Sequence, residues 1–131
     1  MGKKILAAGG TVGPNTRRAS GLYALGRLKV GQRNKTEAEY EERLKVMLRL
    51  GTIHWYRFEG LKLRLADNTF YTPDFAVLSH DGVMECHEVK GHWQDDARVK
   101  IKVAAEQYPF RFFAVKKLPK NAGGGWDTEI F

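Results

Sequence analysis

One predicted hairpin constrains the fold of this chain more than any other feature. Apolar and aromatic residues dominate residues 70–78 and 83–90, and His80-Asp81-Gly82 between them is typical of a tight turn. The first run is entered through Thr72-Pro73, and Gly91 ends the second. The pattern therefore predicts two antiparallel strands, over 70–78 and 83–90, that pair side by side.

Two upstream segments also have strand patterns. Residues 53–58 form an aromatic run typical of a strand, and Trp55 and Phe58 in it are expected to lie in the core. Leu61–Leu65 alternates strictly between apolar and charged residues, which predicts a half-buried strand.

Helical patterns flank these strands. A helix is expected from about Thr36 to Gly51, capped by Asn34 or Thr36, because apolar residues recur there at helical spacing. A second helix is expected over 95–107, followed by a buried strand over 111–115. The order of helix, three or four strands, helix and strand predicts an α/β domain with a mixed sheet and helices on its faces.

The positive charge is concentrated at the N-terminus. The net charge is +7, yet residues 36–131 hold fourteen Lys/Arg and fifteen Asp/Glu, whereas residues 1–35 hold no acidic residue. We therefore divide the chain into a basic arm, 1–34, and a folded domain, 35–131. Such an arm favours contact with a polyanion such as nucleic acid, although a solubilising tail or a cloning remnant would have the same composition. The arm-side cations expected to contact DNA are Arg17, Arg18, Arg27, Lys29, Arg33 and Lys35.

Composition excludes several other classes of protein. The chain has 131 residues, 43% of them hydrophobic, which suits a folded domain with a real core. No apolar run approaches the roughly 18 residues of a membrane span. No signal peptide is recognised, so a cytoplasmic protein is expected. The single cysteine, Cys86, excludes an internal disulfide and a cysteine-based zinc site.

The hairpin brings charged residues together. Asp74 and Glu88 lie on its two strands, and Glu88 and Lys90 project from the same strand face because they are two residues apart. Two neighbouring carboxylates repel unless a cation lies between them, and Mg²⁺ accepts one or two carboxylates together with water and phosphate oxygens. The backbone carbonyl of Val89 could add a ligand. These residue types therefore suit metal-assisted hydrolysis of a phosphodiester, in which Lys90 orients the attacking water or stabilises phosphate charge. The alternative interpretation is a surface salt bridge between Lys90 and one carboxylate.

The order of these motifs resembles the PD-(D/E)XK nuclease superfamily, whose core has the order α-β-β-β-α-β and a restriction-endonuclease-like fold. More narrowly, three segments are similar to phage and prophage endonuclease-like proteins related to the Holliday-junction resolvases called phage endonuclease I. These segments are Asn34–Glu37, Tyr71–Phe75 and Glu88–Gly91, followed by a similar stretch through Arg98. The resemblance covers about residues 34–118.

The resemblance implies that a helix glutamate completes the metal site. Glu37 matches that position best, and Glu41, one helical turn later, is the rival. Glu37, Asp74, Glu88 and Lys90 are then the expected catalytic residues, and Glu37, Asp74, Glu88 and Val89 the expected metal ligands. Mg²⁺ is the expected cofactor, with Mn²⁺ able to substitute, and no small-molecule cofactor is expected.

The expected function is a structure-selective DNA endonuclease, a resolvase of branched phage DNA acting in the cytoplasm of a bacterial host. Symmetric cutting of two strands requires two sites, so a homodimer is expected. Two alternatives remain: a less selective DNase of a phage replication or packaging complex, and a catalytically silent DNA-binding module. Further DNA contacts are expected from His92, Arg98, Lys100 and Lys102, although the last three also fit a solvated helix face.

Overall fold

The computed structural model describes residues 32–90 and 95–131, and Arg33–Phe131 form one compact unit. Predictions that concern residues 1–31 and 91–94 lie outside these ranges. The described helices and strands are, in chain order, α2 (Lys35–Leu50), β1 (Ile53–Phe58), β2 (Leu63–Ala66), β3 (Thr69–Tyr71), β4 (Phe75–Ser79), β5 (Met84–Lys90), α3 (Asp95–Gln107), β6 (Arg111–Lys117), the 3-10 helix η1 (Lys120–Ala122) and β7 (Trp126–Ile130).

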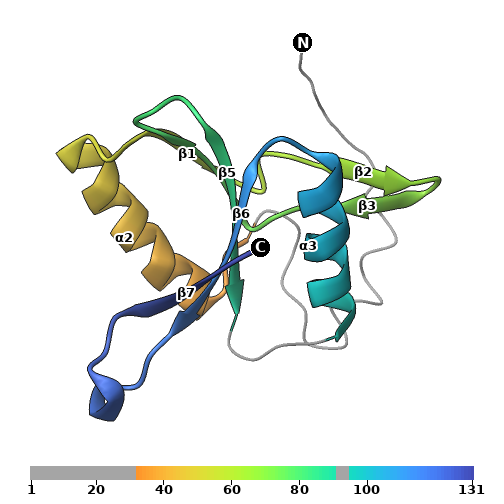
Figure 1. The fold of residues 1–131 in the computed structure, drawn as a ribbon. Helices are drawn as coiled ribbons and strands as arrows, with labels where there is room; N and C mark the ends of the chain where they lie inside the picture. The colour runs from red at the N-terminus through yellow and green to blue at the C-terminus, as the bar shows by residue number, and fades with distance from the viewer. Residues whose placement is uncertain (1–31, 91–94) are drawn as a thin grey trace. The chain divides into compact units, whose positions relative to one another are not determined.

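The main sheet is mixed. Its five strands have the spatial order β1-β4-β5-β6-β7, and β5 and β6 are parallel while the other neighbours are antiparallel. β2 and β3 form a separate two-stranded hairpin that packs with α3 (Figure 1). The predicted α/β class with a mixed sheet and helices on its faces is confirmed.

Each face of the main sheet has its own core. On one face, Tyr40 and Leu44 of α2 pack against Val77, Val89 and Val115. On the other, residues of α3 pack with residues of the β2–β3 hairpin and of the sheet. This second cluster consists of Leu63, Leu65, Tyr71, Cys86, Ile101, Ala104 and Phe112. Because side chains alternate along a strand, neighbouring residues of β5 point to opposite faces of the sheet.

Helix α2 begins and ends where its sequence signals predict. Asn34 is the N-cap: its side chain accepts from the Glu37 N–H, and the Glu37 carboxylate accepts from the Asn34 N–H in return. Gly51 ends the helix in the left-handed region, with φ of 80°, where glycine pays no Cβ penalty. The prediction of a second helix over 95–107 is also confirmed.

The predicted single strand over 70–78 is wrong. Thr72, Pro73 and Asp74 interrupt it, so β3 pairs with β2 whereas β4 pairs with β1 and β5. Pro73 has no N–H to donate to a strand ladder, and the chain changes sheets at this point. Five strands therefore lie between the helices instead of three or four, and Trp126–Ile130 adds a strand after β6. The predicted order α-β-β-β-α-β differs from the structure in both respects.

The prediction that Trp55 lies in the core is also wrong, because 39% of this residue is exposed. A register irregularity between Ile53 and Trp55 shifts the alternation of β1. Ile53 is buried, and Tyr56 and Phe58 pack against the α2-side core, so Trp55 is left on the outer face.

A buried chain of polar groups links α2 to the sheet. The Tyr40 hydroxyl lies 2.7 Å from Nδ1 of His87, and Nε2 of His87 lies 2.9 Å from the Glu85 carboxylate. Arg111 donates to the other Glu85 oxygen at 3.2 Å. His87 is 5% exposed, so these partners replace the water that its ring nitrogens would otherwise bind.

Tyr40→Phe is expected to destabilise the fold by about 1–3 kcal/mol, because it leaves a buried His87 nitrogen without its partner. Thermal or urea unfolding measures the change. Tyr56→Phe is the matched control, since its half-buried hydroxyl bonds Glu41, and its cost should be clearly smaller. Equal losses in the two variants would contradict the importance of the buried chain.

Candidate metal centre

Backbone bonds hold Asp74 directly before β4. Its carbonyl accepts from the Glu59 N–H at 2.7 Å, and its side-chain Oδ2 accepts from the Val89 N–H at 2.8 Å. The β4–β5 register ends at the pair Phe75↔His87. The Asp74 carboxylate continues the contact between the two segments by accepting from the Val89 N–H of β5. Pro73 is fully buried beside it. These contacts fix Asp74 against β5.

Glu88 is 8% exposed, and both of its oxygens have partners. The Tyr71 hydroxyl donates to Oε1 at 2.7 Å, and the Lys90 ammonium lies 3.0 Å from Oε2. Burial and the negative charge of Glu88 raise the pKa of Tyr71, so the phenol stays protonated and donates. Oε2 of Glu88 is therefore the carboxylate oxygen that contacts a cation, the Lys90 ammonium.

Asp74, Glu88 and Lys90 occupy one side of the sheet. Phe75 pairs with His87, so Asp74, directly before β4, lies beside Glu88 of β5. Glu88 and Lys90 share a face because they alternate with Val89, which lies in the α2-side core. The contact between Glu88 and Tyr71 places this group on the α3 side, where Tyr71 belongs to the core cluster.

The environment of Asp74 disfavours its charged form. Burial, followed by the negative charge of Glu88, raises its pKa to about 8, and the charge of Glu37 acts in the same direction. The Val89 N–H and the Lys90 ammonium oppose these effects only in part. A cation between the carboxylates would reverse the balance, because it favours ionised Asp74.

The two candidate helix glutamates have different surroundings. Glu41 accepts from the Tyr56 hydroxyl at 2.8 Å and pairs with Arg33. Glu37 closes the capping box at the start of α2, and its charge acts on Asp74. The arrangement therefore favours Glu37 over Glu41 as the helix carboxylate of this centre.

Within residues 32–90 and 95–131, no three acidic, histidine or cysteine side chains lie close enough together to hold a metal ion. The candidate ligands here are the carboxylate pair Asp74 and Glu88, and Glu37 acts on Asp74 through its charge. A pair still fits Mg²⁺, which retains several waters and completes its octahedron with substrate phosphate oxygens. It does not fit a metal that needs an all-protein cage.

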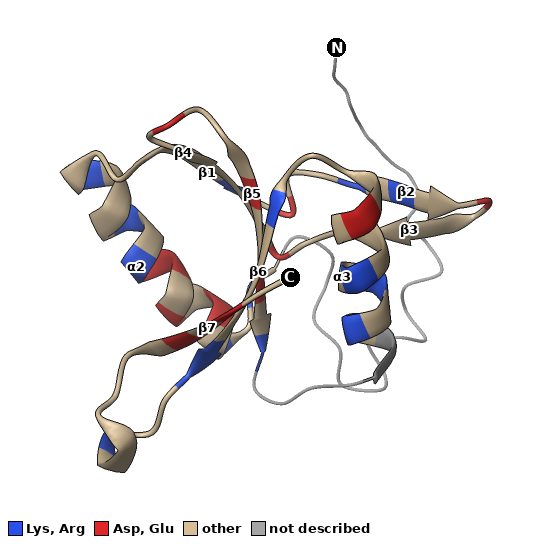
Figure 2. Ribbon diagram, in the orientation of Figure 1, with Lys and Arg blue, Asp and Glu red and all other residues tan. Residues whose placement is uncertain are grey.

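The predicted DNA-contacting residues are distributed unevenly. Lys35, Lys100 and Lys102 are exposed, and the blue parts of the ribbon in Figure 2 mark Lys and Arg positions on both α2 and α3. Arg33 pairs with Glu41, and Arg98 pairs with Glu129 at 2.8 Å. The remaining candidates lie outside the described residues: Arg17, Arg18, Arg27, Lys29 and His92.

Sequence reasoning assigned no role to Tyr71, although it belongs to the Tyr71–Phe75 segment that carries the resemblance. Its position three residues before Asp74 was the available signal. The contact itself depends on the change of sheet at Pro73. Because of this change, Tyr71 is the last residue of β3, in the hairpin that packs with α3.

Comparison with protein-family models, with curated proteins and with solved structures found no match to this chain. No helix within the described residues is long and apolar enough to cross a membrane.

Proposed function

We propose that this protein is a Mg²⁺-dependent DNA endonuclease with a restriction-endonuclease-like core. The observation that carries the proposal is the half-buried Asp74 beside the buried Glu88, with the Lys90 ammonium 3.0 Å from Glu88. A structural ion pair needs one carboxylate and one ammonium. The second carboxylate raises the electrostatic cost of the arrangement, and a divalent cation offsets that cost.

In the proposed mechanism, Asp74 and Glu88 would hold Mg²⁺, and the Val89 carbonyl and Glu37 would complete the protein's contribution to the site. The bound cation supplies Lewis-acid stabilisation of the phosphate and of the attacking water. Lys90 orients that water and stabilises the charge that develops on the phosphate oxygens. The water oxygen forms the new bond to phosphorus and loses a proton to solvent, the phosphodiester P–O bond breaks, and the departing oxygen takes a proton from solvent.

The proposed substrate is branched DNA, cut by a homodimer that supplies two sites. The motif order and spacing of Asn34–Glu37, Tyr71–Phe75 and Glu88–Gly91 support this narrower assignment. Net charge supports a polyanionic substrate more generally, since the chain carries +7.

Cleavage assays on a four-way junction, a linear duplex and a single strand test the proposal, each with Mg²⁺ and with EDTA. We expect Mg²⁺-dependent nicking that is fastest on the junction. Equal cutting of all three substrates favours the less selective DNase. Binding without cutting in both Mg²⁺ and Mn²⁺ would reject the nuclease proposal and favour a DNA-binding module.

Tyr71→Phe is expected to lower Mg²⁺ affinity and cleavage rate about 10-fold, since partners that orient a metal ligand typically contribute 10–100-fold. The ring that packs beneath α3 is kept, and only the hydroxyl bonded to Glu88 is lost. Cleavage rate measured against Mg²⁺ concentration gives both effects.

Tyr108→Phe is the matched control for this prediction, because its hydroxyl donates to the backbone carbonyl of Arg64 at 2.6 Å. Its Mg²⁺ dependence should equal that of the wild type. Unchanged Mg²⁺ affinity in Tyr71→Phe would show that the phenol does not orient a metal ligand.

A further inference from the structure

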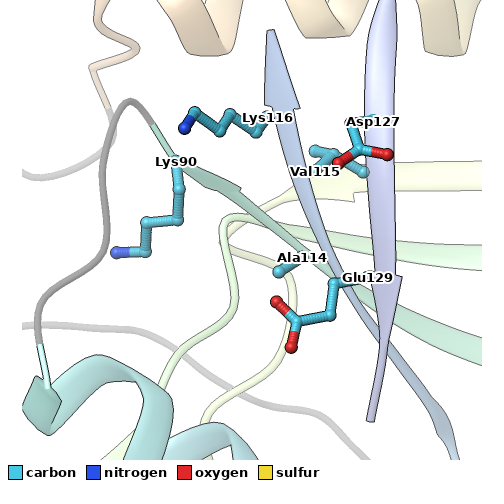
Figure 3. Close-up of a pocket in the computed structure, with 6 residues that line it drawn as sticks. All are labelled: Lys90, Ala114, Val115, Lys116, Asp127 and Glu129. Carbon is cyan, nitrogen blue, oxygen red and sulfur yellow. The ribbon is translucent and has the colours of Figure 1, made fainter.

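A shallow pocket opens next to the carboxylate centre, on the β5–β6–β7 part of the sheet (Figure 3). It is lined by Lys90, Ala114, Val115, Lys116, Asp127 and Glu129. The strand register places Glu88 beside Ala114 and Lys90 beside Lys116. The pocket therefore adjoins the carboxylate centre at Lys90, on the side of β5 away from Asp74.

Two lysines are next to each other at this pocket. Lys90 and Lys116 are partners in the parallel β5–β6 register, so their backbones lie about 4.8 Å apart. Like charges at directly opposed sheet positions destabilise a sheet. Lys90 is paired with Glu88 at 3.0 Å, so an anion bound at this pocket would compensate the charge of Lys116.

Lys116 does not use the carboxylate nearest to it in register. Asp127 is its partner on β7, yet no ion pair joins Lys116 to any acidic residue of the described chain. In Figure 3 the Lys116 ammonium extends away from Asp127, toward the strand that carries Lys90. Its neighbour Lys117, on the opposite face, pairs with Glu39 at 2.8 Å.

The acidic residue beside Ala114 is already neutralised. Glu129 receives both Arg98 guanidinium nitrogens, at 3.0 and 2.8 Å. Such a bidentate pair offsets the repulsion that Glu129 would exert on an incoming anion. Among the described residues, Lys116 is then the lining cation without an ion pair, and Asp127 is the lining carboxylate without one.

We propose that Lys116 binds a phosphate group of the nucleic-acid backbone next to the scissile one, on which Lys90 acts. This inference rests on the proposed function, because it uses the position of the carboxylate centre to identify the anion as part of the substrate. Lysine binds phosphate as a point charge, and its flexible stem suits a backbone contact without sequence preference. Lys116 is thereby a binding residue that holds the nucleic-acid strand where it passes over β6.

The test measures binding of a short DNA duplex in EDTA over a range of salt concentrations, so that no cleavage occurs. Each lost phosphate contact lowers the slope of log K against log salt by about 0.9. We expect Lys116→Gln to bind more weakly, with the slope reduced by about that amount. Lys117→Gln removes the same charge one residue away, and its slope should equal that of the wild type.

Equal slopes for Lys116→Gln and the wild type would overturn the inference, as would equal reductions in both variants, which would indicate a net-charge effect alone. The nuclease proposal is judged separately, by Mg²⁺-dependent cleavage with the wild-type protein. A reduced slope in Lys116→Gln without any wild-type cleavage would support the binding site and reject the nuclease. Absence of wild-type binding would overturn both.

Discussion

Asp74→Asn is expected to reduce Mg²⁺-dependent DNA cleavage by about 10³-fold, because removing an anionic ligand costs the cation site several kcal/mol of transition-state stabilisation. Asparagine has nearly the same volume, and its side-chain oxygen can still accept from the Val89 N–H that holds Asp74 at 2.8 Å. The fold should therefore survive. Single-turnover cleavage rates, together with a thermal unfolding curve, separate loss of chemistry from loss of structure.

Glu42→Gln is the control for that substitution. It removes the same unit of negative charge from an exposed position on α2, where Glu42 pairs only with Lys45 at 3.0 Å among its described contacts. Its cleavage rate should stay close to that of the wild type. Wild-type rates in Asp74→Asn would exclude this carboxylate from the reaction.

The second large effect concerns stability, Mg²⁺ and pH together. Without a cation, burial and the charge of Glu88 raise the pKa of Asp74 to about 8. Between about pH 4 and pH 8 the folded protein therefore holds a proton that the unfolded chain has released. The free energy of unfolding in EDTA should decrease across this window as the pH rises.

Mg²⁺ should act in the opposite direction, because it binds ionised Asp74. If the Mg²⁺ concentration is about 100 times the Kd at about pH 8.5, binding adds about 2.7 kcal/mol. That corresponds to a rise in Tm of about 10–20 °C for a domain of this size. At about pH 6 a competing proton weakens binding about 100-fold, which leaves only about 0.4 kcal/mol.

Thermal unfolding in Mg²⁺ and in EDTA at both pH values measures this difference. Asp74→Asn, which cannot titrate, should lose both the pH-dependent decrease and most of the stabilisation by Mg²⁺. A Tm increase of equal size at the two pH values would contradict the proposed linkage between proton and metal at Asp74.

Local signals were sufficient to predict both helices and the central hairpin. Asn34 caps α2 and Gly51 ends it with positive φ, because these residue types satisfy helix ends through their own chemistry. The turn over 80–82 likewise joins β4 to β5, with Gly82 at φ of 83°. Such features depend on a few neighbouring residues, which is why a single sequence reveals them.

Features that depend on distant partners were missed. The pattern over 70–78 is continuous, and only pairing with β2 on one side and β1 and β5 on the other divides it at Pro73. Trp126–Ile130 has few apolar residues, so its strand is apparent only from its pairing with β6. The exposure of Trp55 follows from a register irregularity that its apolar character does not indicate.

In the candidate site too, some features follow from local sequence and others depend on distant partners. Strand alternation alone predicts that Glu88 and Lys90 share a face, and the hairpin register brings Asp74 beside them. The influence of Glu37 depends on how α2 crosses the sheet. The contact from Tyr71 depends on the packing of a separate hairpin, and neither arrangement is encoded in local spacing.

Anomalous diffraction from crystals grown with Mn²⁺ tests the central claim most directly, because it locates the metal without any assumption about substrate. We predict one strong peak at coordination distance from the carboxylates of both Asp74 and Glu88, and no such peak in Asp74→Asn crystals. A wild-type map without density there, or with Mn²⁺ bound only at unrelated surface carboxylates, would contradict it.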